Sequence, residues 1–343
     1  MNSLPCEDKG TTFYEELQLL PGLDKRDKRG KRHDLGIVLL GFTLALLSKR
    51  DGNLSSIHRH MKNHYVETCR FVGILPFHVI SRSQLPLVLS SVNVAVLEAH
   101  IFKFYGIRLS ESEKQWFSGD GKELRGSIET GDKRGEAVVQ LVAHDTGKVL
   151  NETFYNGKKA SEKPAMRDLI VSSGACGQKI SLDALHFSPE TLQLIHQGGG
   201  SYLVGLKGNQ KKLLAEMKRA SQHLPCLYED EKSEKKHGRI DTRSYESFDI
   251  GKEYIDKRWA NCGLRILIKV NRQRQNLKTG KESFETAFYM TDSESDSKTK
   301  AKELFEAVRK HWSVEVTNHI RDVTLNEDAF RTKKTIVPRL LPL

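Results

Sequence analysis

The stretches Phe117–Lys122 (FSGDGK) and Ile180–His186 (ISLDALH) decide the fold prediction, because each sets one aspartate at or near the end of a short β-prone run. Small residues lie beside both aspartates, and the strand-like run Ala137–His144 lies between them in sequence. If the two runs form neighbouring strands, Asp120 and Asp183 can hold divalent metal ions, since Mg²⁺ prefers carboxylate oxygens and keeps open positions for phosphate. Taken singly, either residue can also be a turn or cap aspartate.

A third carboxylate follows on a helix that the sequence predicts over Lys298–Val323. One face of this helix is marked by residues at steps of three and four, namely Leu304, Val308, His311, Glu315, His319 and Asp322. The stripe begins apolar and becomes acidic and imidazole-bearing, so the helix can pack its first half into a core and aim Glu315 at a site. The alternative is an amphipathic helix whose Glu315 pairs with a base such as Arg309.

Three ordered blocks of the sequence resemble those of a known family. Gly119–Ser127 (GDGKELRGS) is similar to the first catalytic block of the insertion-sequence transposases that include the H-repeat-associated proteins, and Ser181–His186 is similar to the second. Arg309–Glu315 (RKHWSVE), followed by Asp322–Val323 and Asn326–Asp328, is similar to the third. The resemblance runs from about residue 15 to about residue 334, nearly the whole chain.

The resemblance implies a DDE transposase with a ribonuclease-H-like core. Its catalytic and metal-binding residues would be Asp120, Asp183 and Glu315, and its cofactor would be two Mg²⁺ or Mn²⁺ ions, with Asp120 bridging them. The implied reaction is hydrolysis of DNA at the element ends, followed by attack of the freed 3′-hydroxyl on target DNA. His186 and His311 would shape the site or contact phosphate, with core packing as the alternative, and Trp312 is expected to anchor the helix by packing.

The implied partner is double-stranded DNA, both the inverted-repeat ends and the target, bound by a homodimer. The expected location is the bacterial cytoplasm, on the nucleoid when DNA is bound. The implied domains are a helical DNA-binding or associated domain at 1–105, a catalytic core at 106–212 and 293–334, a β-rich insertion at 213–292, and an atypical tail at 335–343.

Residues 106–212 fit the α/β order βββαβαβ of such a mixed-sheet core. Strands are expected near 114–119, 136–145, 149–155, 179–183 and 201–206. Helices are expected over 162–173, where Pro164 fits the first turn, and over 188–197, which is followed by three glycines. Within the insertion, the run 229–239 is predicted as a mixed-charge loop with a turn at His237.

Basic residues gather in two places that suit phosphate contacts. Six of the eight residues from 25 to 32 are basic: Lys25, Arg26, Lys28, Arg29, Lys31 and Arg32. Lys207 and Lys211 follow the strand expected over 201–206. Contacts to phosphate give affinity without sequence choice. A solvated loop and a solvated helix start are the respective alternatives.

Length and composition bound the class of protein. The chain has 343 residues, 38% of them hydrophobic and 29% charged, which fits a globular protein of two or three domains. The net charge of +11 favours a polyanionic partner. Five scattered cysteines without a CxxC pair indicate free thiols in a reducing cytoplasm. The sequence begins without a signal-peptide pattern, and the apolar run Leu35–Leu47 is too short to cross a bilayer as a helix, so no membrane partner is expected.

Two features depart from the family pattern. Members commonly carry Ile-Glu-Asn and then Leu-His-Trp after the tryptophan of the third block, whereas this chain has Val314–Ile320 (VEVTNHI), so Glu327 or Asp328 is a fallback third ligand. The tail Thr335–Leu343 contains two prolines, which oppose the helix expected there and suggest a truncated or frame-shifted copy. Two alternatives to an active transposase stay open: a catalytically inactive remnant that still binds DNA, and a nuclease that cuts without joining.

Overall fold

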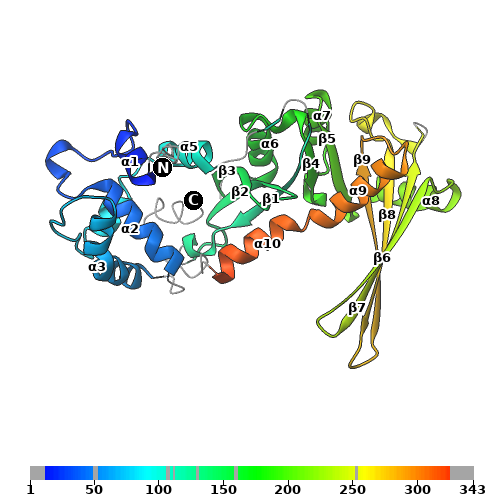
Figure 1. The fold of residues 1–343 in the computed structure, drawn as a ribbon. Helices are drawn as coiled ribbons and strands as arrows, with labels where there is room; N and C mark the ends of the chain where they lie inside the picture. The colour runs from blue at the N-terminus through cyan, green and yellow to red at the C-terminus, as the bar shows by residue number, and fades with distance from the viewer. Residues whose placement is uncertain are drawn as a thin grey trace, which may run out of the picture. The chain divides into compact units, whose positions relative to one another are not determined.

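The computed structural model describes residues 12–48, 53–105, 109–110, 113–128, 131–157, 161–251 and 254–324. The chain divides into two compact units (Figure 1). One comprises residues 1–105, 123–136 and 318–343, and the other comprises residues 106–122 and 137–317. The fallback ligands Glu327 and Asp328, the tail 335–343 and Cys6 lie outside the described residues.

The regular elements of residues 12–105, within the described ranges, are helices. They are α1 (Phe13–Leu19), α2 (Leu35–Ser48), α3 (Leu54–Phe71), α4 (Leu85–Leu89) and α5 (Val94–Tyr105), with a 3₁₀ turn at Lys28–Gly30. Thr12 and Glu15 form a reciprocal capping box that starts α1. The apolar run predicted as a core helix is α2, and its Phe42 packs in one buried cluster with Ile57 of α3. No helix in the described part of the chain is long and apolar enough to cross a membrane.

The other unit is built on a mixed sheet whose chain order is the predicted βββαβαβ. Its first strands are β1 (Trp116–Glu123), β2 (Glu136–Ala143), β3 (Val149–Asn156), β4 (Lys179–Leu182) and β5 (Ser201–Leu206). The helices between them are α6 (Glu162–Ser172) and α7 (Pro189–Gln197). β4 pairs in parallel with β1 on one side and with β5 on the other. The helix predictions at 162–173 and 188–197 are therefore confirmed, and this α/β arrangement is compatible with a ribonuclease-H-like core.

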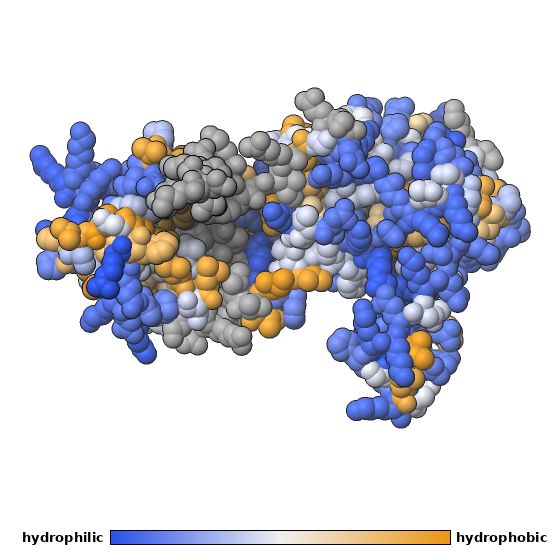
Figure 2. Space-filling model, viewed as in Figure 1, coloured by the Kyte–Doolittle hydropathy of each residue, from blue (hydrophilic) through white to orange (hydrophobic). Residues whose placement is uncertain are grey.

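The strands of the predicted insertion continue the same sheet. They are β6 (Tyr228–Lys236), β7 (Arg239–Asp249), β8 (Ile266–Asn276) and β9 (Glu282–Thr291), preceded by α8 (Lys211–His223). Because β9 pairs antiparallel with β5, the sheet has nine strands in the order β3-β2-β1-β4-β5-β9-β8-β7-β6. The far ends of β6–β9 run on as a long ribbon (Figure 1), and its surface is mostly hydrophilic (Figure 2).

The loop predicted over 229–239 is wrong, because most of it forms β6. The cross-strand partners in β7 hold this charged segment extended, for example Lys232 opposite Arg243 and Glu234 opposite Asp241. The predicted turn at His237 is confirmed. His237 and Gly238 have φ values of 51° and 71°, and two central residues of positive φ match the twist of a tight hairpin.

The single helix predicted over 298–323 is also wrong, since it is interrupted at His311 and Trp312. The chain forms α9 (Lys298–Lys310), α10 (Ser313–His319) and a π-helical turn at Ile320–Thr324. At the interruption, the His311 ring is turned toward the sheet, where its Nδ1 lies 3.0 Å from Oγ of Ser181 in β4. This buried contact between His311 and Ser181 competes with a continuous helix. The periodicity of the sequence does not reveal such a contact between distant residues.

The sheet is covered on both faces near its centre. Phe117, Ile180 and Tyr202 lie in one buried cluster with side chains from α6 and α7. Leu203, on the opposite face of β5, belongs to another cluster with Leu304 and the neighbouring apolar residues of α9. The alternation of side chains along each strand therefore decides which helix layer each residue meets.

Phe117→Ala should lower the free energy of unfolding by about 3–5 kcal/mol, because a completely buried ring in the central sheet leaves a cavity. Phe284→Ala is the matched control: its ring is 71% exposed, and its loss should cost less than about 0.5 kcal/mol. Urea unfolding followed by far-UV circular dichroism measures both. Equal losses in the two variants would contradict the core assignment.

Candidate active site

The register of β1 against β4 sets Asp120 and Asp183 side by side. Gly119 pairs with Leu182 at the last paired position, so the next residue on each strand is an aspartate. Asp183 follows the end of β4 directly, as predicted. Asp120 lies inside β1, which continues to Glu123, although the pairing with β4 stops one residue before it. Both carboxylates are therefore held at the edge where β4 ends.

Asp183 also has a local structural role. Its Oδ1 accepts a hydrogen bond of 2.9 Å from the backbone N–H of Leu185 and so caps the 3₁₀ turn Ala184–His186. The two interpretations of this residue, cap and site carboxylate, are thus compatible. The cap fixes the side chain at the end of its strand.

Electrostatics show that further carboxylates face Asp120. Burial, followed by the negative charges of Glu162, Asp183 and Glu315, raises the pKa of Asp120 to about 7, against the opposing effect of the hydrogen bond from the N–H of Gly121. Partial burial raises the pKa of Glu315 on α10, and the nearby Lys207 ammonium opposes this shift. The three predicted carboxylates therefore share one electrostatic environment. Glu162, at the start of α6, joins them, and no motif in the sequence singled it out.

His186 and His311 relate to the site in different ways. His186 is completely buried, and its Nε2 lies 3.0 Å from Oε1 of Glu162, so it is not available to a DNA phosphate. His311 lines the cleft described below, but burial lowers its pKa to about 4. Burial thus favours the neutral form of the His311 ring.

A cleft of about 560 Å³ opens in front of these carboxylates. Asp120, Asp183 and Glu315 line it together. Basic and aromatic side chains line it as well, from the residue after β5, from α8, β8 and β9, and from the helix interruption, namely Lys207, Lys218, Arg272, Tyr289 and Trp312. Trp312 was predicted to pack, but its side chain is 51% exposed. Lys211, at the start of α8, is exposed to solvent and is not among the residues of the cleft wall.

The donor set fits a hard divalent cation. The groups that converge are carboxylates, which Mg²⁺ and Mn²⁺ prefer, and their mutual repulsion is the kind that a bound cation relieves. As placed, no three histidine, cysteine, aspartate or glutamate side chains of the described residues form a complete ligand set. The arrangement thus provides carboxylates that suit a divalent metal ion.

The basic run at 25–32 is mostly exposed, with one exception. Lys25, Lys28, Arg29 and Arg32 are exposed to solvent. The Arg26 guanidinium instead pairs with Asp24, with Nε 2.9 Å from Oδ1, and donates to the carbonyl of His33. Its side chain is only 10% exposed, and its guanidinium closes a loop in this structure, so the DNA contact expected for Arg26 stays a prediction. Lys31 lies 3.5 Å from the same Asp24 carboxylate.

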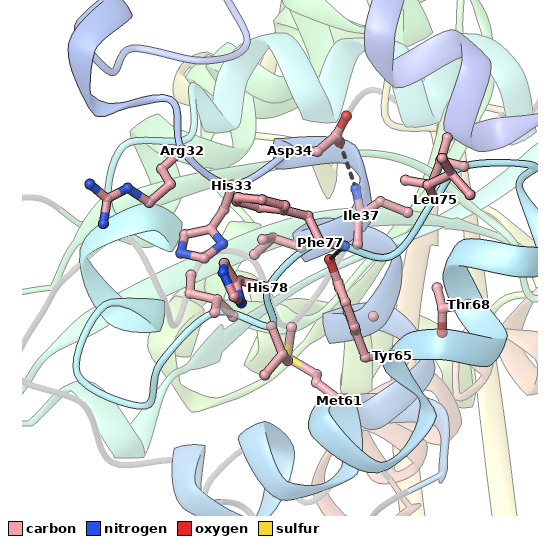
Figure 3. A pocket seen from close by; sticks show the side chains of 15 residues that line it. Arg32, His33, Asp34, Ile37, Met61, Tyr65, Thr68, Leu75, Phe77 and His78 are labelled. Atoms are coloured by element: carbon pink, nitrogen blue, oxygen red, sulfur yellow. Dashed lines mark hydrogen bonds between the residues drawn. The ribbon is translucent and has the colours of Figure 1, made fainter.

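A small cavity of about 150 Å³ lies in the helical region of residues 12–105. Arg32, His33 and His78 lie together at one side of it, and Tyr65 and Phe77 also line it (Figure 3). The Nε2 of His58 in α3 lies 2.7 Å from the carbonyl oxygen of Ile80, a residue that also lines the cavity. That histidine therefore has a structural partner beside the cavity.

Asp120→Asn should remove a pH dependence of folding. Asp120 ionises with a pKa near 3.8 in an unfolded chain and about 7 in the folded protein, so the folded state binds the extra proton between these values and stability falls as pH rises. The variant should be more stable than wild type at pH 8 and lose this advantage toward pH 4. Urea unfolding in EDTA at both pH values tests this, with Asp168→Asn as the exposed control; a D120N slope equal to that of wild type would contradict it.

Comparison with known proteins agrees with the sequence blocks. Residues 107–337 match the family model described as "Transposase DDE domain". "Putative protein YbfL" of Escherichia coli K12 is 26% identical over 333 residues, which is 94% of this chain and 85% of that protein. "H repeat-associated putative transposase YhhI" of the same strain is 26% identical over 338 residues, with the same two coverages. "H repeat-associated putative transposase YbfD" is 25% identical over 259 residues, 71% of this chain and 96% of that protein. The chain therefore belongs to the DDE transposase family, as its three blocks predicted.

Proposed function

We propose that the protein is a metal-dependent DNA transposase that cuts and rejoins DNA at the ends of an insertion sequence. The observation that carries the proposal is the β1–β4 register, which brings Asp120 and Asp183 together in a cleft that Glu315 also lines. The DDE family of the chain supports the same reaction class. The mixed sheet then serves as a ribonuclease-H-like core.

Asp120, Asp183 and Glu315 would hold two Mg²⁺ or Mn²⁺ ions, with Asp120 between the other two. Such a pair of ions activates an attacking oxygen and stabilises a leaving oxygen in phosphodiester chemistry. The protein's own contribution is to fix the carboxylates on rigid strand ends and to confine the phosphate near them. One site can thus serve hydrolysis at the element end and then attack by the freed 3′-hydroxyl on target DNA, without a covalent protein intermediate.

The cleft wall supplies groups that suit a DNA strand. Lys207 and Lys218 can neutralise phosphates on either side of the reacting one, which positions the strand without reading its sequence. Arg272 is oriented by a 2.9 Å hydrogen bond to the hydroxyl of Tyr289. The half-exposed ring of Trp312 offers a stacking surface for a base. The cleft therefore combines basic groups for the phosphates, an aromatic ring for a base and carboxylates for the metal ions.

The remaining parts of the chain are assigned roles by the same proposal. Residues 1–105 would form the DNA-binding or associated domain, residues 106–212 and 293–334 the catalytic core, and residues 213–292 the insertion. The protein would act on double-stranded DNA, at inverted-repeat ends and at the target, as a homodimer in the bacterial cytoplasm. The exposed basic side chains of the run at 25–32 support the DNA-binding assignment.

Asp120→Asn, Asp183→Asn and Glu315→Gln should each abolish Mg²⁺-dependent cleavage while DNA binding stays nearly intact, because shape is kept and the negative charge is lost. The assay incubates protein with terminal inverted-repeat DNA and Mg²⁺ and resolves nicks and strand-transfer products. Glu327→Gln and Asp328→Asn are the controls and should retain most activity.

The outcomes separate the rival functions. Loss of cleavage in Glu327→Gln or Asp328→Asn, together with activity in Glu315→Gln, would move the third ligand downstream. Nicks without strand-transfer products from wild-type protein would favour a nuclease. Binding of the ends without any cutting would favour the inactive remnant.

Neutralising Lys25, Lys28, Arg29 and Arg32 together should weaken DNA binding at all sequences and flatten its salt dependence. Each lost phosphate contact removes about 0.9 from the slope of log affinity against log salt. Arg26→Gln is the matched comparison: it breaks the pair with Asp24 and should lower stability with little change in that slope. Fluorescence anisotropy with a labelled duplex over a salt series measures both, and an unchanged slope in the fourfold variant would leave the segment as a solvated loop.

A further inference from the structure

The two faces of β1 meet different helices at the position of Asp120. Ser118 faces the α9–α10 side, where its Oγ lies 3.4 Å from the carbonyl oxygen of Lys310 and 3.4 Å from Oγ of Ser313. Asp120, two residues later, shares that face by strand alternation. The glycines on either side of it face α6 instead, where a Cβ at Gly119 would collide with Leu182 and crowd Met166.

Gly121 leaves room for one particular group of α6, the carboxylate of Glu162. A Cβ built at Gly121 would fall within the carboxylate of Glu162. A side chain here would displace the carboxylate, so the glycine leaves the space in which the carboxylate reaches β1 from the opposite face. Asp120 lies beside Gly121 in β1, at the point where the pairing of β1 with β4 has stopped. The negative charge of Glu162 is also the largest influence on the pKa of Asp120 after burial.

His186 fixes the Glu162 carboxylate in this place. Its ring is completely buried, Nε2 lies 3.0 Å from Oε1 of Glu162, and Nδ1 is buried without a hydrogen-bond partner. The imidazole is therefore oriented by Glu162 alone among hydrogen-bonding groups in the described residues. The turn that carries His186 is capped by Asp183. One turn after β4 thus positions two carboxylates, its own Asp183 and, through His186, Glu162.

Four carboxylates directed at one strand end repel one another, and partial burial increases the cost of keeping them ionised. A Glu–His pair that served only to tether α6 to the turn would gain nothing from lying against Asp120. Compensation by a cation gives the arrangement a physical reason, because carboxylate oxygens beside the first ligands hold and orient a bound divalent ion.

We propose that Glu162 is a fourth carboxylate of the divalent-cation site and that His186 is its positioning residue. The inference rests on the proposed function, since it extends the same site. Glu162 supplies negative charge from the α6 face, whereas Glu315 supplies it from the α10 face. His186 acts only through Glu162, because its ring is buried behind the carboxylate.

The test is Mn²⁺ binding by isothermal titration calorimetry on the full chain without DNA. Glu162→Gln should weaken Mn²⁺ affinity about 10–100-fold, the size of effect seen when groups that orient a metal site are removed. His186→Asn should weaken it less, and the double variant should be no worse than Glu162→Gln, because the two residues act as one unit. Asp168→Asn is the control: it removes a carboxylate from the same helix, exposed to solvent, and should bind like wild type.

Folding is checked by melting in EDTA. Should Glu162→Gln lower the melting temperature, Gly121→Ala gives a second measurement, since the added methyl displaces the carboxylate without removing it. Weaker Mn²⁺ binding there supports the inference, and wild-type binding overturns it.

The two hypotheses fail differently. Wild-type affinity in Glu162→Gln, with affinity lost in Asp183→Asn, overturns the role of Glu162 and leaves the proposed function standing. No Mn²⁺ binding by the wild-type protein, or full binding by Asp183→Asn, overturns both. Equal losses in Asp168→Asn and Glu162→Gln would reduce the effect to net charge and also overturn the inference.

Discussion

The parallel pairing of β1 with β4 is the constraint on which the candidate active site depends. Two interactions fix the register that pairs Gly119 with Leu182: the backbone hydrogen bonds between the strands, and the burial of Phe117 and Ile180 against the helices. A slip of one residue would reverse the faces of β1, turning Asp120 toward α6 and Phe117 toward the other layer. Packing of the core and placement of the carboxylates are therefore specified by the same alternation.

Much of this arrangement could be predicted from the sequence, because it depends on residues that are close together along the chain. Short β-prone runs and turn glycines specified the first five strands and α6 and α7, and the two aspartates were found because each sits where a strand or its pairing stops. The third carboxylate came from helical spacing and from the resemblance. It lines the cleft of the structure even though the helix that suggested it is interrupted at His311 and Trp312.

What the sequence could not predict depends on contacts between distant residues. The proximity of Glu162 to Gly121 arises from α6 crossing β1, which no spacing along the chain encodes. The removal of Arg26 from the basic surface depends on Asp24 accepting its guanidinium. The membership of β6–β9 in the main sheet depends on β9 meeting β5, and charged β6 lacks the apolar alternation by which strands are recognised.

The pairing of β9 with β5 has a consequence for the exposed edge of the central sheet. A core that ended at β5 would present an open edge with unpaired N–H and C=O groups on a strand whose Tyr202 and Val204 are fully buried, and such edges recruit other chains into aggregates. In the nine-stranded sheet, the open edge on this side is β6 instead of β5. There the outermost strand carries closely spaced lysines and glutamates, which discourage strand addition. Residues 213–292 therefore cover the edge of β5, and their deletion would leave a protein prone to self-association.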